Sequence, residues 1–246
     1  MSEISLFVTL TSLWMMGIYG RNKILAVPLV VGVAGCIANG LCYYAYYALY
    51  PLANQRTAAA VADIGWLVQE CGLSFYSFQI LRSILTGKKR IIYFATFGTF
   101  CGLTVLARIL ILAFRQKGFE GMDVQATVNA FHMVYFLAIA CMEVANAWFL
   151  MNKLGANSAV SSQSAVRETL IASSELRMAS LCLIGIMRAV TYYFQSAAQA
   201  ASNVAGELDR FVAGLENLFP FVMLVSPPLR RPAPSPHPGL PPAFCV

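Results

Sequence analysis

Charged residues are scarce in this sequence. Only 11% of its 246 residues are Asp, Glu, Lys or Arg, and 59% are hydrophobic, whereas about a quarter of the residues in soluble domains are charged. This scarcity excludes an ordinary water-soluble globule and predicts an all-α, polytopic membrane protein embedded in a lipid bilayer. The net charge of +6 does not indicate a nucleic-acid partner, because the basic residues lie in short loops between apolar runs.

Histidine and several catalytic motifs are also missing. With only His132 and His237, the chain cannot supply the ligands of several haems or of a membrane di-iron centre. It has no Asp-rich diphosphate motif, Gly-rich phosphate loop, GxSxG elbow or HExxH. Its seven cysteines include no CxxC pair, so neither a disulfide nor a metal site is expected. What remains is acid–base chemistry without metal or cofactor on a lipophilic small molecule, or binding without chemistry.

Seven apolar runs approach the ~20 residues that a membrane crossing needs. They cover residues 4–19, 24–50, 58–85, 91–114, 127–150, 178–196 and 211–225. Eleven Lys and Arg residues would lie on one side of the membrane, against four on the other: Arg56, Arg115, Lys117 and Arg210. Because the side richer in Lys and Arg is usually cytosolic, we expect a lumenal N-terminus, a cytosolic C-terminus and a multi-pass protein of the endoplasmic reticulum.

Several segments have further predicted roles. Residues 1–225 would form a seven-helix transmembrane domain, and the Pro-rich residues 226–246 a disordered tail. In the loop of residues 151–177, residues 166–176 could form a short interfacial helix. Gly98 and Gly102 form a GxxxG in the fourth run, which predicts a close helix contact, and Gly65 is also expected to serve packing.

Two acidic residues stand inside the third apolar run. Asp63 and Glu70 are seven residues apart, so at ~100° per residue they lie only ~20° apart on a helix, with Trp66 on the same stripe. A carboxylate in hydrocarbon is costly, faces a protein interior or a watery cavity, and usually marks a functional site. The pair therefore predicts a site inside the bundle.

Other runs carry polar side chains that would complete this site. Arg108, Arg188 and Glu216 are ionisable, and a nearby Arg would keep one carboxylate ionised while burial keeps another protonated. With the predicted orientation, most of these side chains fall in the lumenal half, where we expect the cavity, whereas Glu143 lies deeper, toward the cytosol. The expected substrate-binding residues are Trp66, His132, Asn129, Glu143, Asn146, Tyr192 and Asn217.

Two acid-bearing segments, DIGWLVQECGLSFYSFQIL (residues 63–81) and LDRFVAGLENLFPF (residues 208–221), carry a family resemblance. Together with the length and the seven spans, they resemble the integral-membrane terpene cyclases of fungal meroterpenoid pathways, of the ascofuranone and ascochlorin type. The resemblance implies that a carboxylic acid protonates a terminal epoxide of a prenylated aromatic, and that a ring closes through a carbocation. Glu70 or Asp63 would then be the proton donor, Glu216 the orienting group or terminal base, and Tyr192 and Trp66 would line the cation path.

Two other functions stay open. A seven-transmembrane receptor has the same layout, although the third run ends FQILRSIL without an acidic-Arg-aromatic triplet and the seventh lacks NPxxY. A transporter would show broken helices in matching halves, and Pro28 and Pro220 do not pair in that way. Buried Arg–Glu pairs can also simply hold helices together. Because each of these functions could use the same acids, the sequence does not decide among them, nor does it indicate an oligomeric state.

Overall fold

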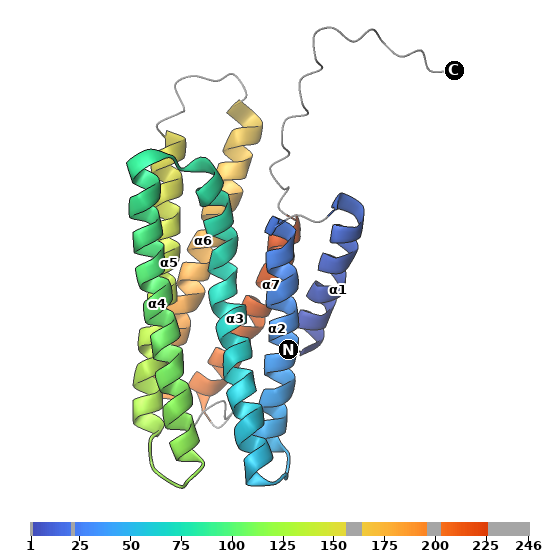
Figure 1. Ribbon diagram of the computed structural model, residues 1–246, viewed down its shortest axis with the longest axis vertical. Coiled ribbons are helices and arrows are strands. Elements are labelled where there is room, and N and C mark those ends of the chain that lie inside the picture. Colours follow the sequence, from blue (N-terminus) through green and yellow to red (C-terminus); the bar gives the residue numbers. More distant parts are fainter. Residues whose placement is uncertain (1, 21–22, 156–163, 196–202, 226–246) are drawn as a thin grey trace, which may run out of the picture.

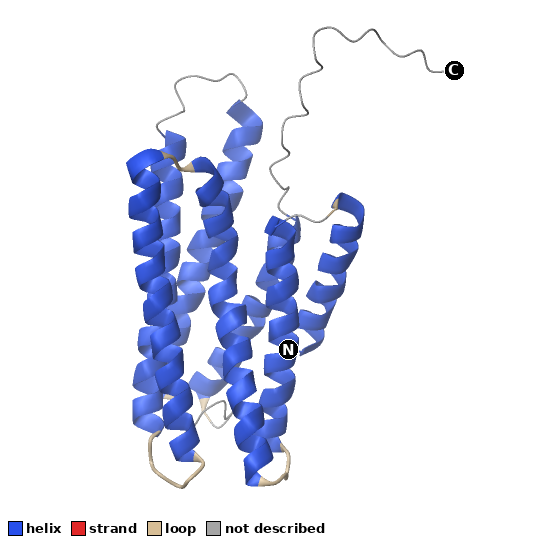
Figure 2. Ribbon diagram, in the orientation of Figure 1, coloured by secondary structure: helices blue, strands red, loops and turns tan. Residues whose placement is uncertain are grey.

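The described part of the chain is entirely helical. The computed structural model describes residues 2–20, 23–155, 164–195 and 203–225, and contains no strand in them (Figures 1 and 2). Each apolar run predicted from the sequence overlaps one helix, so the all-α prediction is confirmed. The helices are α1 (Ser2–Tyr19), α2 (Lys23–Tyr47), α3 (Leu52–Ile84), α4 (Gly87–Gly118), α5 (Gln125–Gly155), α6 (Ser164–Phe194) and α7 (Val204–Val225).

Apolar length distinguishes three of these helices. Among the described residues, Leu25–Tyr47, Gly87–Gly118 and Gln125–Lys153 are long and apolar enough to cross a membrane, and α1 contributes a shorter apolar stretch, Glu3–Ile18. Large hydrophobic side chains also stand on the outside of the bundle: Trp14, Leu106 and Trp148 are each more than half exposed. A soluble monomer rarely exposes so much continuous apolar surface. The exterior is therefore suited to lipid.

The helices run alternately up and down and enclose the polar residues. α3 stands in the middle of the bundle and packs against α2, α4 and α5, while α7 packs against α1, α2 and α6 (Figure 1). The connections from α2 to α3 and from α4 to α5 lie at one end, together with the last turn of α6 and the first turn of α7. This end is called here the α2–α3 end. The opposite end, where α3 passes to α4, is called the α3–α4 end. The sequence predicts that the α2–α3 end is lumenal.

Glycine explains the close approach of α2 and α3, but not the packing of α4. A Cβ atom on Gly65 would lie 2.9 Å from the Ala38 Cβ and 3.1 Å from the Ala34 carbonyl oxygen, so only glycine permits this contact. By contrast, a Cβ atom on Gly98 or Gly102 would meet nothing within 4 Å. The GxxxG prediction of a close contact is therefore wrong within the described bundle, because this face of α4 is turned outward.

The fifth and sixth helices extend beyond the predicted spans. Residues 166–176 are helical, but they continue directly into the sixth apolar run as one helix, α6, instead of forming a separate interfacial helix. Between Ser164 and Ile184 the sequence has no Gly or Pro to end a helix. The predicted Pro-rich tail, residues 226–246, lies outside the described residues.

Candidate functional site

A network of buried ionisable side chains occupies the interior of the bundle. Three helices each contribute two such residues spaced seven apart: two acids on α3, two arginines on α4 and two acids on α7. Seven residues are nearly two helical turns, so each pair lies on one face of its helix. Arg188 of α6 completes the network, and all members are buried: Asp63, Glu70, Arg108, Arg115, Arg188, Asp209 and Glu216.

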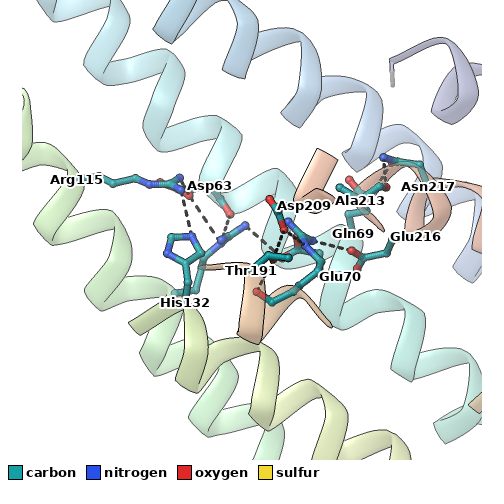
Figure 3. A network of polar contacts seen from close by, with 12 residues as sticks. Asp63, Gln69, Glu70, Arg115, His132, Thr191, Asp209, Ala213, Glu216 and Asn217 are labelled. Atoms are coloured by element: carbon teal, nitrogen blue, oxygen red, sulfur yellow. Dashed lines mark hydrogen bonds and ion pairs between the residues drawn. The ribbon is translucent and has the colours of Figure 1, made fainter. Parts of the chain in front are cut away.

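Arg188 joins three carboxylates from two helices. Its Nη1 atom lies 2.5 Å from the Glu70 Oε1 and 2.7 Å from the Glu216 Oε2. Its Nε atom donates to the Asp209 Oδ1 at 3.2 Å, and the Thr191 hydroxyl donates to the same oxygen at 3.3 Å (Figure 3). A single guanidinium thus holds α3, α6 and α7 together by charge-assisted hydrogen bonds.

Arg108 and Arg115 hold the other end of the network. The Arg115 Nη1 lies 2.6 Å from the Asp63 Oδ1. Arg108 donates from Nε to the Asp63 carbonyl oxygen at 3.1 Å, and its Nη2 lies 3.4 Å from the Glu70 Oε2. Glu70 therefore stands between two guanidiniums, one at each carboxylate oxygen, and both stabilise its ionised form.

His132 acts as a neutral partner of Arg115. The His132 Nδ1 lies 2.8 Å from the Val128 carbonyl oxygen, which can only accept a hydrogen bond, so this nitrogen carries the proton. The Nε2 atom is then free to accept from the Arg115 Nη2 at 3.1 Å. The ring also stacks on Tyr192, with centroids 4.2 Å apart and planes 3° apart. His132 therefore positions Arg115.

The charges of the network do not balance. Among the buried, ion-paired groups, four carboxyls would contribute −4 and three guanidiniums contribute +3, which leaves −1. A fourth guanidinium, that of Arg210, also lines the cavity, but it is only half-buried and donates to the Tyr47 hydroxyl at 2.6 Å. An uncompensated buried charge is expensive, and such groups are neutralised by a proton instead.

One carboxyl group of this network is thus best accommodated in its protonated form. Glu216 and Asp209 each contact one nitrogen of Arg188. The nitrogen at Glu216 is shared with Glu70, whereas Asp209 has its own nitrogen and also accepts from the Thr191 hydroxyl. Glu216 is therefore the better placed to hold the proton.

The network opens into a cavity of about 570 Å³ that is lined by residues of α2, α3, α6 and α7. Four members of the network, Glu70, Arg188, Asp209 and Glu216, line one wall, and Tyr43, Tyr47 and Trp66 supply aromatic surface. Since Tyr43 and Tyr47 are also exposed on the outside of α2, the cavity has its entrance beside them. It lies in the half of the bundle nearer the α2–α3 end. A volume of this size suits one small ligand.

Asn217 and Asn129 have clear structural partners. The Asn217 Oδ1 accepts from the Gln69 Nε2 at 2.7 Å and from the Ser5 hydroxyl at 3.0 Å, which ties α1, α3 and α7 together at the cavity wall. The Asn129 Nδ2 donates to the carbonyl oxygen of Gln195 at 2.8 Å. This carbonyl stands at the C-terminal end of α6, where helix carbonyls lack partners. Asn129 thus caps α6.

Not every residue that the sequence predicts for the site reaches the cavity. Trp66, Glu70, Arg188, Glu216 and Asn217 line it. The lining does not include Asp63 and Arg108, which belong to the network, or His132 and Tyr192, which adjoin it. The remaining three, Asn129, Glu143 and Asn146, lie outside both the cavity lining and the network.

Sequence reasoning missed Arg115 and Asp209. It placed Arg115 among the loop charges outside the membrane, which is wrong, because only 7% of this residue is exposed and it is bound to Asp63. Arg177, counted on the opposite side, is likewise buried. A repeated spacing in the sequence could have revealed Arg115 and Asp209. Arg115 follows Arg108, and Glu216 follows Asp209, by seven residues, the interval that also separates Asp63 from Glu70.

No metal site accompanies the network: within the described residues no three His, Cys, Asp or Glu side chains come together in a way that could hold an ion. Comparison with known proteins adds no relative, since no protein-family model, no curated protein and no solved structure matches the chain.

Proposed function

We propose that the protein is a membrane-bound, metal-independent terpene cyclase that protonates an epoxide or alkene of a prenylated aromatic and closes a ring through a carbocation. The observation that supports it best is the cavity, in which one surplus carboxyl group faces aromatic walls. A lipophilic chain can fold against such walls, and the electron-rich ring faces stabilise a cation. The family resemblance of the two acid-bearing segments points to the same reaction.

In this proposal all seven helices cross the membrane of the endoplasmic reticulum, with the N-terminus lumenal. The three long helices that are not among the three apolar spans, α3, α6 and α7, carry the acids or Arg188 on their inward faces. Their outward faces are apolar, with Ile64 on α3, Leu183 on α6 and Leu218 on α7 all exposed. Removing Arg115 and Arg177 from the loop charges leaves ten against three, so the positive-inside rule still favours this orientation.

The geometry supports a division of roles among the acids. Glu216 gives its carboxyl proton to the epoxide oxygen, and the C–O bond at the more substituted carbon breaks as the π electrons of a nearby alkene form the new C–C bond. The resulting cation loses a proton to a carboxylate of the network, or captures water and then loses a proton. Glu70, held between two arginines, stays ionised and stabilises the cation.

This assignment differs from the one that the sequence suggests. Glu70 and Asp63 are the donors expected from the resemblance, but each is paired with guanidinium groups, and Asp63 does not line the cavity. A carboxylate that lies between two guanidiniums, as that of Glu70 does, is a poor acid. Asp63 is better described as a positioning residue for Arg108 and Arg115.

Amide substitution in microsomes tests the proposal. With an epoxidised farnesyl-aromatic substrate, Glu216→Gln should lower the cyclisation rate by roughly 10²- to 10⁴-fold, the usual contribution of a general acid. Glu120→Gln is the matched control, since the Glu120 side chain is 54% exposed and pairs with Arg56, which is not a member of the network. Unchanged cyclisation by Glu216→Gln would refute the acid assignment. Wild-type protein that binds the substrate without converting it would instead favour a receptor.

A further inference from the structure

A second group of buried polar side chains lies between the cavity and the α3–α4 end. Six atoms of this group have no hydrogen-bond partner among the described residues: both carboxyl oxygens of Glu143, the hydroxyls of Ser74 and Ser77, the Asn146 Nδ2 and the Arg177 Nε. Buried polar groups are nearly always hydrogen-bonded, to protein or to ordered water. So many unpaired atoms in one region indicate that something else binds them.

The side chains come from four helices, α3, α4, α5 and α6. The Tyr93 hydroxyl of α4 donates to the Asn146 Oδ1 at 2.9 Å, which leaves the Asn146 Nδ2 as a donor on the side of Glu143. Glu143 and Asn146 are three residues apart on α5 and share one face. The Ser74 hydroxyl of α3 and the Asn146 amide adjoin the Glu143 carboxyl and interact with it, but neither reaches it with the distance and angles of a full hydrogen bond. Hydroxyl, amide and carboxyl groups thus surround one point, without completing hydrogen bonds to one another.

In the described part of the chain, Glu143 has no guanidinium partner to balance a negative charge, unlike the acids of the cavity. The residue is completely buried, and within the described residues no Lys, Arg or His nitrogen lies within 4.0 Å of its carboxyl oxygens. Arg177 of α6 exerts a longer-range attraction, but its guanidinium lies over the Tyr76 ring, 4.5 Å from the centroid. Since an isolated buried carboxylate is neutralised by a proton, the uncharged acid is the stable form.

We propose that Glu143 is the centre of a second site, which binds water molecules and exchanges a proton with solvent at the α3–α4 end. Water bridges the carboxyl to Ser74, Asn146 and Arg177, because a buried water needs two to four polar partners of this kind. The other titratable groups that face Glu143 are Tyr93, Cys71 and Cys182. Ser74 is one helical turn from Glu70 on α3, so the site brings exchangeable protons close to the cavity.

Infrared spectroscopy of the purified protein without substrate tests this site independently of the proposed function. A protonated carboxyl group has a C=O stretching band that shifts when its proton is replaced by deuterium. We expect two such bands in the wild type at neutral pH, one from Glu143 and one from Glu216. Glu143→Gln should remove one of them, and the matched control Glu216→Gln should remove the other and retain the Glu143 band. Transfer to D₂O should shift the Glu143 band within minutes if water reaches the site.

Two results would overturn the proposal. The absence of any band that depends on Glu143 would mean that the residue is ionised and paired. A band that stays unshifted after hours in D₂O, while exposed amides exchange, would mean a dry and closed site. If Glu143→Gln does not fold, the smaller change Ser74→Ala serves instead: it should move the frequency of the band by removing one hydrogen-bonding group, and an unmoved band contradicts the site.

Discussion

Replacing Arg188 by methionine removes the guanidinium that the structure places among three carboxyl groups. Methionine retains much of the length of the side chain, so the change removes charge and hydrogen bonds more than packing. The network would change from three guanidiniums and four carboxyls to two and four. Glu216 and Asp209 would lose the only ion-pair partner that they have among the described residues, and Glu70 would keep Arg108 alone.

The expected loss of stability is large. Removing one partner of a buried ion pair typically costs about 3–5 kcal/mol, because the other charge stays buried without compensation. Three carboxyls lose a partner here, but each can take up a proton, which limits the total to about the same range. For a chain of this size, roughly 2–4 °C of Tm corresponds to each kcal/mol. We therefore expect Arg188→Met to melt about 10 °C below the wild type.

A thermal melt in detergent, followed by circular dichroism, measures this shift. The double variant Arg188→Met with Glu216→Gln should recover part of the loss, because one unpaired carboxyl is then gone. Arg82→Met is the matched control, since Arg82 is exposed in the last turn of α3, and a surface change of this kind is usually worth less than about 0.5 kcal/mol. Equal Tm values for Arg188→Met and Arg82→Met would show that the network does not hold the bundle together.

Three further predictions concern packing and pairing. Gly65→Val should destabilise the protein by about 1–3 kcal/mol, because the new side chain meets α2. Gly98→Ala should instead stabilise it by roughly 0.5–1 kcal/mol, since Gly98 is helical and has open space around it. Thermal melts that rank the two variants in the reverse order would contradict the α2–α3 contact. The Cys71 and Cys101 sulfurs are 3.8 Å apart, so a short bifunctional thiol reagent should cross-link α3 to α4 in the wild type but not in Cys101→Ser. Mass spectrometry of the digested protein detects the cross-link, and equal cross-linking in both proteins would disprove the pairing. Tyr93→Phe should cost about 1 kcal/mol by removing the hydrogen bond to Asn146, and chemical denaturation that detects no loss would contradict that bond.

The sequence by itself determined the elements and part of the site. Apolar runs of near-membrane length fix the helices, because in hydrocarbon every backbone group must be hydrogen-bonded within its own segment. The seven-residue spacing of Asp63 and Glu70 fixed a common face by helix geometry alone. The same rule would have linked Arg115 to Arg108 and Asp209 to Glu216, had the ends of α4 and α7 not looked like charged loops.

Only the tertiary structure decided which side chains meet. Helix periodicity says which residues share a face, but it does not say which helix that face contacts or how two helices are shifted along each other. Glu143 shares its face of α5 with His132 in the sequence pattern, yet His132 binds Arg115 while Glu143 belongs to a separate cluster. Likewise, the pairing of Glu70 with both Arg108 and Arg188 depends on the packing of α3, α4 and α6. Because charge compensation is a property of several helices at once, the protonated member of the network could be chosen only after the helices were assembled.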